Sequence, residues 1–237
     1  MPPSLIKMII MKSWHKQDIE RYLEVQETIR TQYPGLHLTE EYGLVRIRGF
    51  LSVKIPDINR EMDHFMIDIL FPPDYPKHIP IVRETEGKIP KTADRHFNAN
   101  GTACLFFRDA RHVYFPFDAT FSHFMEKIVV SFFVWQIDYE VHAGNPIMKG
   151  MAHNTAGILE YYFRFIGTDN VSVVRRFLEY LCAKKIRQTW KCYCDSGKKL
   201  RECHYCFIKD LQTKIVSRRD IRTSRAAVLQ LSRNMQH

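Results

Sequence analysis

Cys104 lies at the end of a polar segment that could support covalent chemistry. Residues 95–106 read RHFNANGTACLF and place a histidine, two asparagines and an Asn-Gly turn shortly before the cysteine. A thiolate on an irregular segment can attack a carbonyl and can also leave, whereas a cysteine buried among apolar side chains is inert. The segment therefore indicates either a nucleophile on a loop or a small core residue.

A second group of reactive side chains lies near the end of the chain, in the segment 191–207, KCYCDSGKKLRECHYCF. A CxC pair is followed, after eight residues, by an adjacent cysteine and histidine: Cys192, Cys194, Cys203 and His204. Three thiolates and one imidazole match a tetrahedral zinc site whose positions are all filled by protein, and such an ion is structural. We predict one Zn²⁺ per chain, with Cys206 as an alternative to His204.

The positive charge of the chain is concentrated at its end. Residues 184–237 hold 14 Lys and Arg against 4 Asp and Glu, while residues 1–183 hold 21 against 22. This asymmetry predicts two domains, a near-neutral one over 1–183 and a basic zinc-binding module with its tail over 184–237. The basic residues either form a plain solvated surface or meet an acidic protein surface. A nucleic acid is the less favoured partner, because aromatic residues do not alternate with the basic ones.

Composition places the chain among ordinary globular proteins. The hydrophobic share is 45% of 237 residues, enough for a full core. The most apolar window, 128–137, is too short to cross a bilayer, and the first residues lack the pattern of a secretion signal. Four of the six cysteines crowd between 192 and 206, which favours metal binding in a reducing compartment. We expect a soluble, cytoplasmic protein with no membrane partner.

Periodicity along the chain predicts an α+β fold. Helical spacing of apolar residues runs over 13–33, and alternation then predicts strands over 45–55, 65–71 and 81–85. No periodic element follows until about residue 120, and so long an irregular segment is usually functional. Further helices are expected over 121–140, 158–166 and 171–187. The prediction is an antiparallel sheet flanked by helices.

Between the second and third strands, residues 71–80 read FPPDYPKHIP, a proline-rich arm that cannot join a sheet ladder. Over roughly residues 13–145, the order of segments in the chain resembles that of ubiquitin-conjugating enzymes. A helix comes first, then a meander of strands, this arm, and finally the His-x-Asn and NGxxCL segments. The resemblance implies the ubiquitin-conjugating (UBC) fold. It also implies that Cys104 carries an acyl group as a thioester and passes it to an amine.

The same resemblance assigns Asn98 to stabilise the oxyanion formed during transfer, and gives His96 a structural role. Two departures bear on this assignment: Phe97 stands where the family usually has proline, and the asparagine lies six positions before Cys104 instead of the usual eight. Asn100 is therefore an alternative oxyanion donor. Asp109 and Asp118 lie downstream, and neither is assigned a part in deprotonating the amine.

The segment 191–207 is similar to the SEC-C zinc motif at the C-terminus of the translocation ATPase SecA, with CxC, SGKK and CH in register and Asp195 where glycine is commoner. The Cys104 segment and this zinc motif together resemble prokaryotic ubiquitin-conjugating-like proteins of bacterial anti-phage CBASS-type operons. Such an enzyme would join the C-terminus of a cGAS-like nucleotidyltransferase to target amines. Activation would come from another protein, because this chain has no Gly-rich nucleotide loop. The alternative is a non-catalytic UBC-fold adaptor that binds a partner protein through the fold and the basic zinc module.

Overall fold

The computed structural model describes residues 13–54, 63–147, 154–214 and 218–234. The chain divides into two compact units. Unit 1 contains Met1–Phe106 and Phe117–Met148, and unit 2 contains Phe107–Pro116 and Lys149–His237. Unit 2 is thus built from two separate stretches of the chain, and the first of them begins three residues after Cys104.

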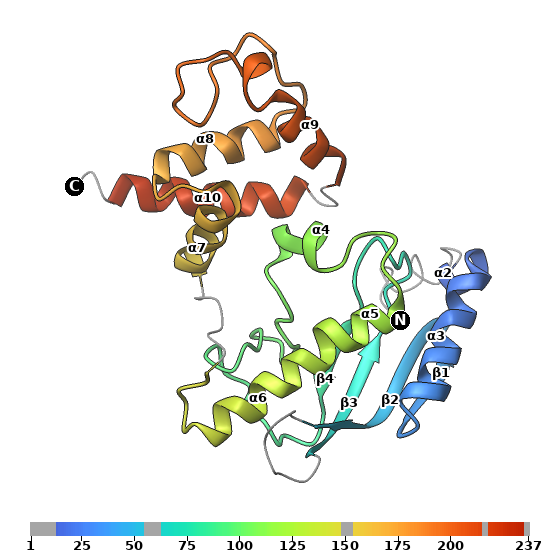
Figure 1. The fold of residues 1–237 in the computed structure, drawn as a ribbon. Helices are drawn as coiled ribbons and strands as arrows, with labels where there is room; N and C mark the ends of the chain where they lie inside the picture. Colours follow the sequence, from blue (N-terminus) through green and yellow to red (C-terminus); the bar gives the residue numbers. More distant parts are fainter. Residues whose placement is uncertain (1–12, 55–62, 148–153, 215–217, 235–237) are drawn as a thin grey trace. The chain divides into compact units, whose positions relative to one another are not determined.

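Unit 1 contains a four-stranded antiparallel sheet in the order β1-β2-β3-β4 (Figure 1). The strands are β1 (Leu36–Glu41), β2 (Leu44–Val53), β3 (Asp63–Leu70) and β4 (Ile81–Glu84). Alternation along β2 buries Val45, Ile47, Leu51 and Val53. The break in the pattern at Gly49 has a steric cause, because a Cβ there would collide with the carbonyl of Gly35.

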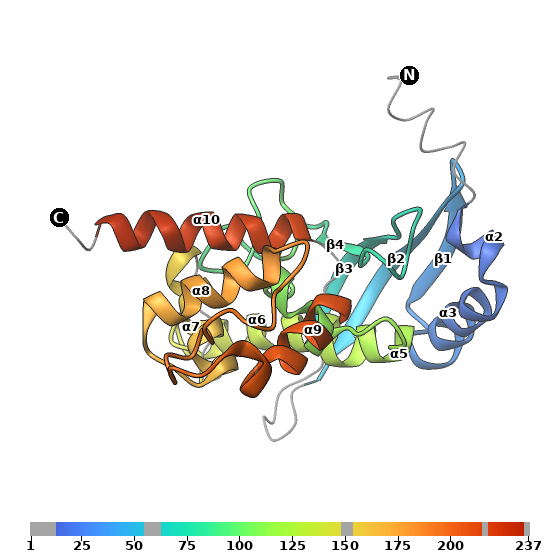
Figure 2. The ribbon, with the colours of Figure 1, turned by 90° about the horizontal axis from the view of Figure 1, so that it is seen from above.

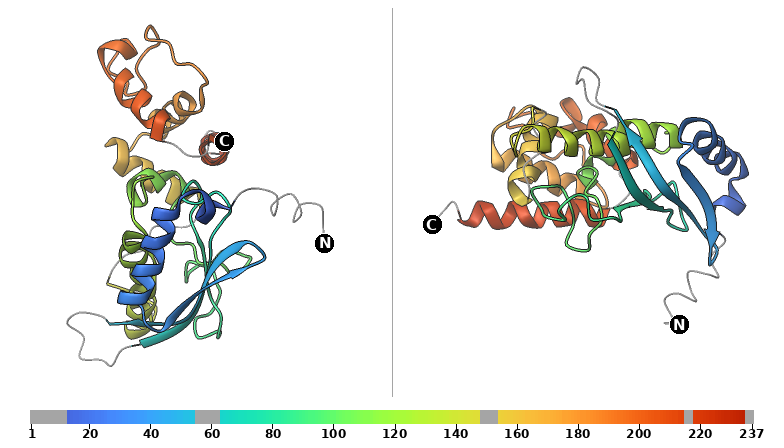
Figure 3. Two further views of the ribbon diagram at one scale, coloured as in Figure 1. Left: turned by 90° about the vertical axis from the view of Figure 1, so that its right-hand side faces the viewer. Right: turned by 90° about the horizontal axis from the view of Figure 1, so that it is seen from below.

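The helices of unit 1 lie on one side of this sheet, as Figure 3 shows for α3 and α6. The helix expected over 13–33 is divided into α2 (Trp14–Gln17) and α3 (Ile19–Gln32) at Asp18, whose carboxylate accepts the Arg21 backbone N–H as an N-cap. The helix expected over 121–140 consists of α5 (Phe121–His123), a π-helical stretch η2 (Phe124–Val130) and α6 (Ser131–Val141). The prediction of an α+β fold with an antiparallel sheet and flanking helices is confirmed.

The proline-rich arm of residues 71–80 lies outside the strands, as its sequence requires. Its aromatic side chains are buried: Phe71 stacks on Trp14 at 5.2 Å between ring centroids, and Tyr75 meets Trp14 edge-on at 4.9 Å. The arm therefore joins α2 to the end of β3 through apolar contacts.

Unit 2 is helical around a core of its own. Its elements are η1 (Arg108–Ala110), α4 (Arg111–Tyr114), α7 (Asn154–Ile166), α8 (Val171–Cys182), η3 (Leu200–Glu202), α9 (Tyr205–Lys214) and α10 (Arg218–Asn234). Figures 1 and 2 show α10 running beside α8. One buried cluster holds Leu178 of α8 together with Leu200, Ile208 and Val228. The expected domain boundary between 183 and 184 would thus run through a shared core.

No helix in the described part of the chain is long and apolar enough to cross a membrane.

Candidate functional site

Cys104 is half-buried at the foot of a short hairpin. Its backbone N–H donates to the carbonyl of His96 at 2.7 Å, and Phe97 and Ala103 face each other in an isolated antiparallel bridge. Ala103 also donates its N–H to the carbonyl of Val82 in β4, at 2.9 Å. The backbone on the N-terminal side of the thiol is therefore fixed both to the hairpin and to the edge of the sheet.

The tip of this hairpin is a tight turn closed by backbone bonds. The N–H of Gly101 donates to the carbonyl of Asn98 at 2.8 Å, and the N–H of Asn98 donates to the carbonyl of Thr102 at 2.8 Å. Gly101 has a φ of +73°, which is the left-handed region that glycine adopts without strain. The Asn-Gly pair thus supplies the turn conformation that the sequence indicates.

Both asparagines bond within the turn. The side-chain amide of Asn98 donates to Thr102, at 2.9 Å to Oγ1 and 3.2 Å to the carbonyl oxygen, and lies 3.5 Å from the Ala103 carbonyl oxygen. Asn100 Oδ1 accepts from the hydroxyl of Thr102 at 2.7 Å and from its backbone N–H at 3.2 Å. Both asparagine side chains therefore help to hold the turn, and the assignment of Asn98 or Asn100 to the oxyanion stays a prediction.

The two downstream carboxylates differ in position. Asp109 belongs to unit 2, where it is buried and accepts the hydroxyl of Tyr162 at 2.7 Å. Asp118 belongs to unit 1 and is exposed. Asp109 is thus engaged in the packing of unit 2.

Arg95 is a residue of this loop to which sequence analysis gives no role. It is 5% exposed and donates from Nε to Gln136 Oε1 at 2.8 Å and from Nη1 to Glu140 Oε1 at 2.6 Å. Its partners lie 41 and 45 residues further along the chain, in α6. No local pattern in the sequence could have revealed such a pairing.

The four predicted metal ligands lie together in unit 2. Their ligand atoms all lie within 4.8 Å of one another: Cys192, Cys194, Cys203 and His204. Cys194 Sγ lies 3.6 Å from Cys203 Sγ, and His204 Nδ1 lies 3.1 Å from Cys203 Sγ. A tetrahedral zinc site with Zn–S bonds of about 2.3 Å has sulfur–sulfur edges of about 3.8 Å, so the cluster has the size for one ion. The expectation that these residues come together is confirmed, with His204 and not Cys206 in the group.

Two turn positions build the loop that carries this cluster. Asp195 has a φ of +61° and Gly197 a φ of +72°. Glycine adopts this left-handed backbone without strain, whereas it is uncommon for an aspartate such as Asp195. Its carboxylate forms an ion pair with Arg176 of α8, which ties the loop to that helix.

The thiols of this cluster differ in acidity. Burial raises the pKa of Cys192 to about 11. Burial also opposes ionisation of Cys194, but hydrogen bonds from Ser196, Cys192 and Cys203 outweigh it and lower the Cys194 pKa to about 6. A thiolate at Cys194 is the form that a metal ion requires.

This chain has few matches among known proteins. No protein-family model matches the chain, and no curated protein matches it. Among solved structures, the yeast Vps23 UEV domain in complex with a Vps27 PSDP peptide is similar at 12% sequence identity and a TM-score of 0.37. That match covers 56% of this chain and 92% of the UEV chain.

Proposed function

We propose that the chain is a ubiquitin-conjugating-like cysteine acyltransferase with a UBC fold in unit 1. The Cys104 thiolate attacks the carbonyl of an activated protein C-terminus and expels its leaving group, which forms a thioester. A target amine then attacks the thioester, Cys104 leaves as a thiolate, and the amine loses a proton as the amide forms. The observation that carries the proposal is a half-buried cysteine whose backbone is hydrogen-bonded at the foot of a polar hairpin.

The donor that we propose is the C-terminus of a cGAS-like nucleotidyltransferase, in bacterial anti-phage defence. The combined resemblance of the cysteine loop and the CxC…CH segment supports this donor. A separate adenylating enzyme would supply the activated C-terminus.

The non-catalytic adaptor is the second candidate, and one observation favours it. The Asn98 amide donates to atoms of Thr102. To stabilise an oxyanion, it would have to exchange one of these partners for the substrate. In an adaptor, these same bonds would simply hold a binding surface.

Intact-mass analysis separates the two functions. Wild type, incubated with a cGAS-like nucleotidyltransferase and its adenylating enzyme, should form an adduct that a thiol reductant removes. Cys104→Ser should form a reductant-resistant ester, and Cys104→Ala should form none. Cys206→Ser is the matched control, because Cys206 is exposed and stands outside the metal cluster. Partner binding that survives in Cys104→Ala, with no adduct on wild type, would establish the adaptor.

For the metal cluster we propose one structural Zn²⁺, held by the three thiols and the His204 imidazole. The donor set and its compactness support this assignment. When bound, the ion would hold the loop closed, and no step of the transfer passes through it. Elemental analysis of protein purified without chelator should give one zinc per chain, and Cys203→Ser should lower that content.

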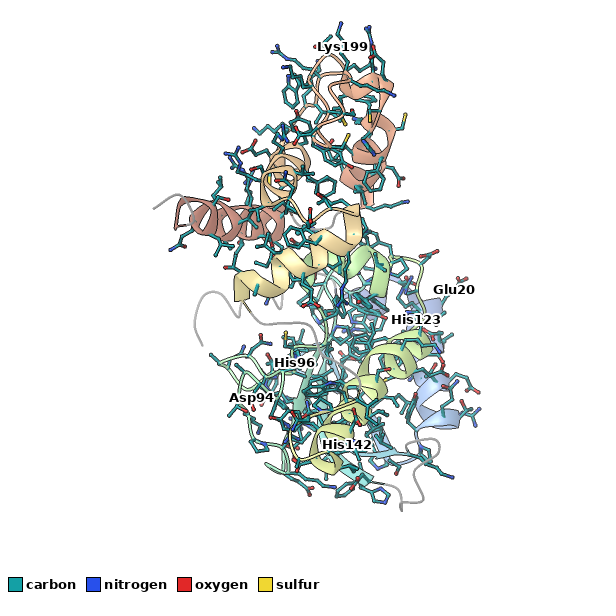
Figure 4. All side chains as sticks on the ribbon, turned by 60° about the vertical axis from the view of Figure 1, so that its left-hand side comes forward. Glu20, Asp94, His96, His123, His142 and Lys199 are labelled. Atoms are coloured by element: carbon teal, nitrogen blue, oxygen red, sulfur yellow. The ribbon has the colours of Figure 1, made fainter. Side chains whose placement is uncertain are left out.

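The loop that carries the cluster also forms a basic surface, which we propose binds an acidic protein surface. The N–H of Leu200 donates to the carbonyl of Trp190, and Lys191 pairs with Lys199 across an antiparallel bridge. We call residues 190–200 the basic ribbon; Lys199, labelled in Figure 4, lies beside Lys191 at its base. Within the described residues, the lysines of the ribbon form no ion pair: Lys191, Lys198 and Lys199.

A further inference from the structure

Arg95 and Gln136 form a reciprocal, buried pair between the cysteine loop and α6. Arg95 Nε donates to Gln136 Oε1 at 2.8 Å, and Gln136 Nε2 donates back to the backbone carbonyl of Arg95, also at 2.8 Å. Gln136 is 1% exposed and Arg95 5%. Hydrogen bonds in such a site are strong, and a buried partner left without one is costly. Gln136 thus fixes both the guanidinium group and the backbone of Arg95.

The neighbours of Arg95 dock on the same helix. The hydroxyl of Tyr139 donates to Asp94 Oδ2 at 3.1 Å, and the Arg95 guanidinium lies over the Tyr139 ring, 4.3 Å from its centroid. The His96 ring meets Trp135 edge-on at 4.8 Å. Asp94 and His96 lie close together on this loop in Figure 4. Three successive residues are therefore held by one face of α6.

The backbone at the end of this docked stretch is strained. His96 has a φ of +54°, which an L-residue other than glycine adopts at a cost unless its surroundings enforce it. The carbonyl of His96 accepts the N–H of Cys104 at 2.7 Å. A contact that holds residues 95 and 96 in place therefore also determines where Cys104 lies.

We propose that the Arg95–Gln136 pair is a positioning clamp for Cys104, set on α6 and acting through the His96 carbonyl. Its role in transfer rests on the acyltransferase function proposed above, while its action on the Cys104 backbone does not. Arg95 and Gln136 are positioning residues: they fix the peptide next to the thiol, so that the thioester carbonyl stands in one orientation towards the incoming amine.

Hydrogen exchange at the Cys104 amide tests the clamp without any partner protein. Arg95→Ala should speed exchange of that amide by about tenfold, the effect of losing about one hydrogen bond, while the Ile47 amide in β2 stays protected. Arg95→Lys, which keeps the charge beside Glu140, should restore part of the protection. Gln136→Glu keeps the acceptor for the guanidinium but loses the donor to the Arg95 carbonyl, so it should also speed exchange.

Controls separate positioning from general destabilisation. Arg30→Ala removes an exposed arginine that bonds to Glu27 within α3, and it should leave Cys104 exchange unchanged. If Arg95→Ala does not fold, Glu140→Gln removes one charged contact at a 57% exposed side chain and should still speed exchange, by less. The proposal is wrong if the Cys104 amide of a folded clamp variant exchanges at the wild-type rate. It is also wrong if the exchange rate of the Ile47 amide rises by the same factor.

Single-turnover kinetics test the consequence for chemistry. Clamp variants should slow discharge of a preformed thioester more than they slow its formation, and Arg95→Lys should recover part of the discharge rate. Equal slowing of both steps would overturn the positioning role. If wild type forms no thioester at all, the acyltransferase function fails, and amide exchange alone then decides whether the clamp fixes Cys104.

Discussion

At the residue scale, spacing in the sequence was enough to identify the metal cluster but not the supports of Cys104. Cys192 and Cys194 lie next to a tight turn, and adjacent Cys203 and His204 return to them, so a local pattern brings the ligands together. The clamp joins residues 41 positions apart in sequence, and only the packing of α6 brings Arg95 to Gln136. Local motifs can be read from a sequence, whereas such long-range polar pairs depend on the fold.

The two asparagines of the hairpin should differ in their effects on transfer. If Asn98 stabilises the oxyanion, Asn98→Ala should slow discharge of a preformed thioester by about a hundredfold, the usual effect of losing one such donor. Asn100→Ala should chiefly loosen the turn, because Asn100 Oδ1 accepts twice from Thr102. Single-turnover discharge, with amide exchange at Thr102 as a measure of turn order, distinguishes them. The reverse ranking would move the oxyanion role to Asn100.

Asp109 should make the stability of unit 2 depend on pH. Burial raises its pKa, although hydrogen bonds from Ser224 and Tyr162 act in the opposite direction. The pKa of Asp109 in the folded protein lies above its value in the unfolded chain. At low pH the carboxyl is protonated in both states, and its burial then carries no cost of ionisation. Stability is lost as pH rises from about 4, the ordinary aspartate value, through the raised pKa.

Asp109→Asn removes this ionisation and keeps an acceptor for Tyr162. The difference in melting temperature between Asp109→Asn and wild type should therefore shift in favour of the variant as pH rises. Asp169→Asn, at an exposed position between α7 and α8, is the control for the loss of a surface carboxylate in unit 2. A difference that stays constant with pH would show that Asp109 does not titrate in this range.

At the element scale, the strands β2, β3 and β4 and the helices α7 and α8 were predicted, whereas η1, α4, β1 and the long helix α10 were not. Alternation identified β2, β3 and β4, and helical spacing identified α7 and α8. The elements η1 and α4 span three and four residues, too few to establish a period. The strand β1 carries polar residues at most of its positions and was missed for that reason.

The basic ribbon should bind its partner through charge that salt can screen. Its exposed lysines lie on a two-stranded loop, and attraction between exposed charges fades over about 8 Å at physiological ionic strength. Lys191→Ala with Lys199→Ala should weaken binding of an acidic partner and flatten its dependence on salt. Lys16→Ala, an exposed lysine of unit 1, is the control. Binding that does not change between low and high salt would exclude a charge-driven contact.

At the scale of the whole molecule, charge and packing divide the chain at different places. The charge asymmetry begins near residue 184, but α7 and α8 pack with the metal-binding loop, α9 and α10. Residues 107–116 belong to the same core through Ala110. Charged residues lie mostly on the surface, whereas a core contains every segment that buries an apolar face in it. A domain boundary drawn from charge can therefore differ from one drawn from packing.

Removal of the proposed zinc ion should unfold unit 2 while unit 1 stays intact. Cys192 and Tyr193 of the metal-binding loop are buried in the same core as Phe177 and Leu178 of α8, so a loop released by chelation exposes part of that core. Amide exchange at Phe177 and Leu178 should rise after treatment with a chelator, and exchange at Val45 in β2 should not. Protection should return when zinc is added back.

A chain cut after residue 183 provides the complementary test. The cut removes Leu200, Ile208 and Val228, each 0% exposed, and leaves α7 and α8 with an uncovered apolar face. We expect the shortened chain to lose exchange protection in α8 and to bind a hydrophobic dye, since so much buried apolar surface is lost. The sheet of unit 1 should keep its protection, because its core is formed by its own strands and helices. If α8 stays protected in the shortened chain, residues up to 183 fold without the zinc module, as the charge distribution alone would suggest.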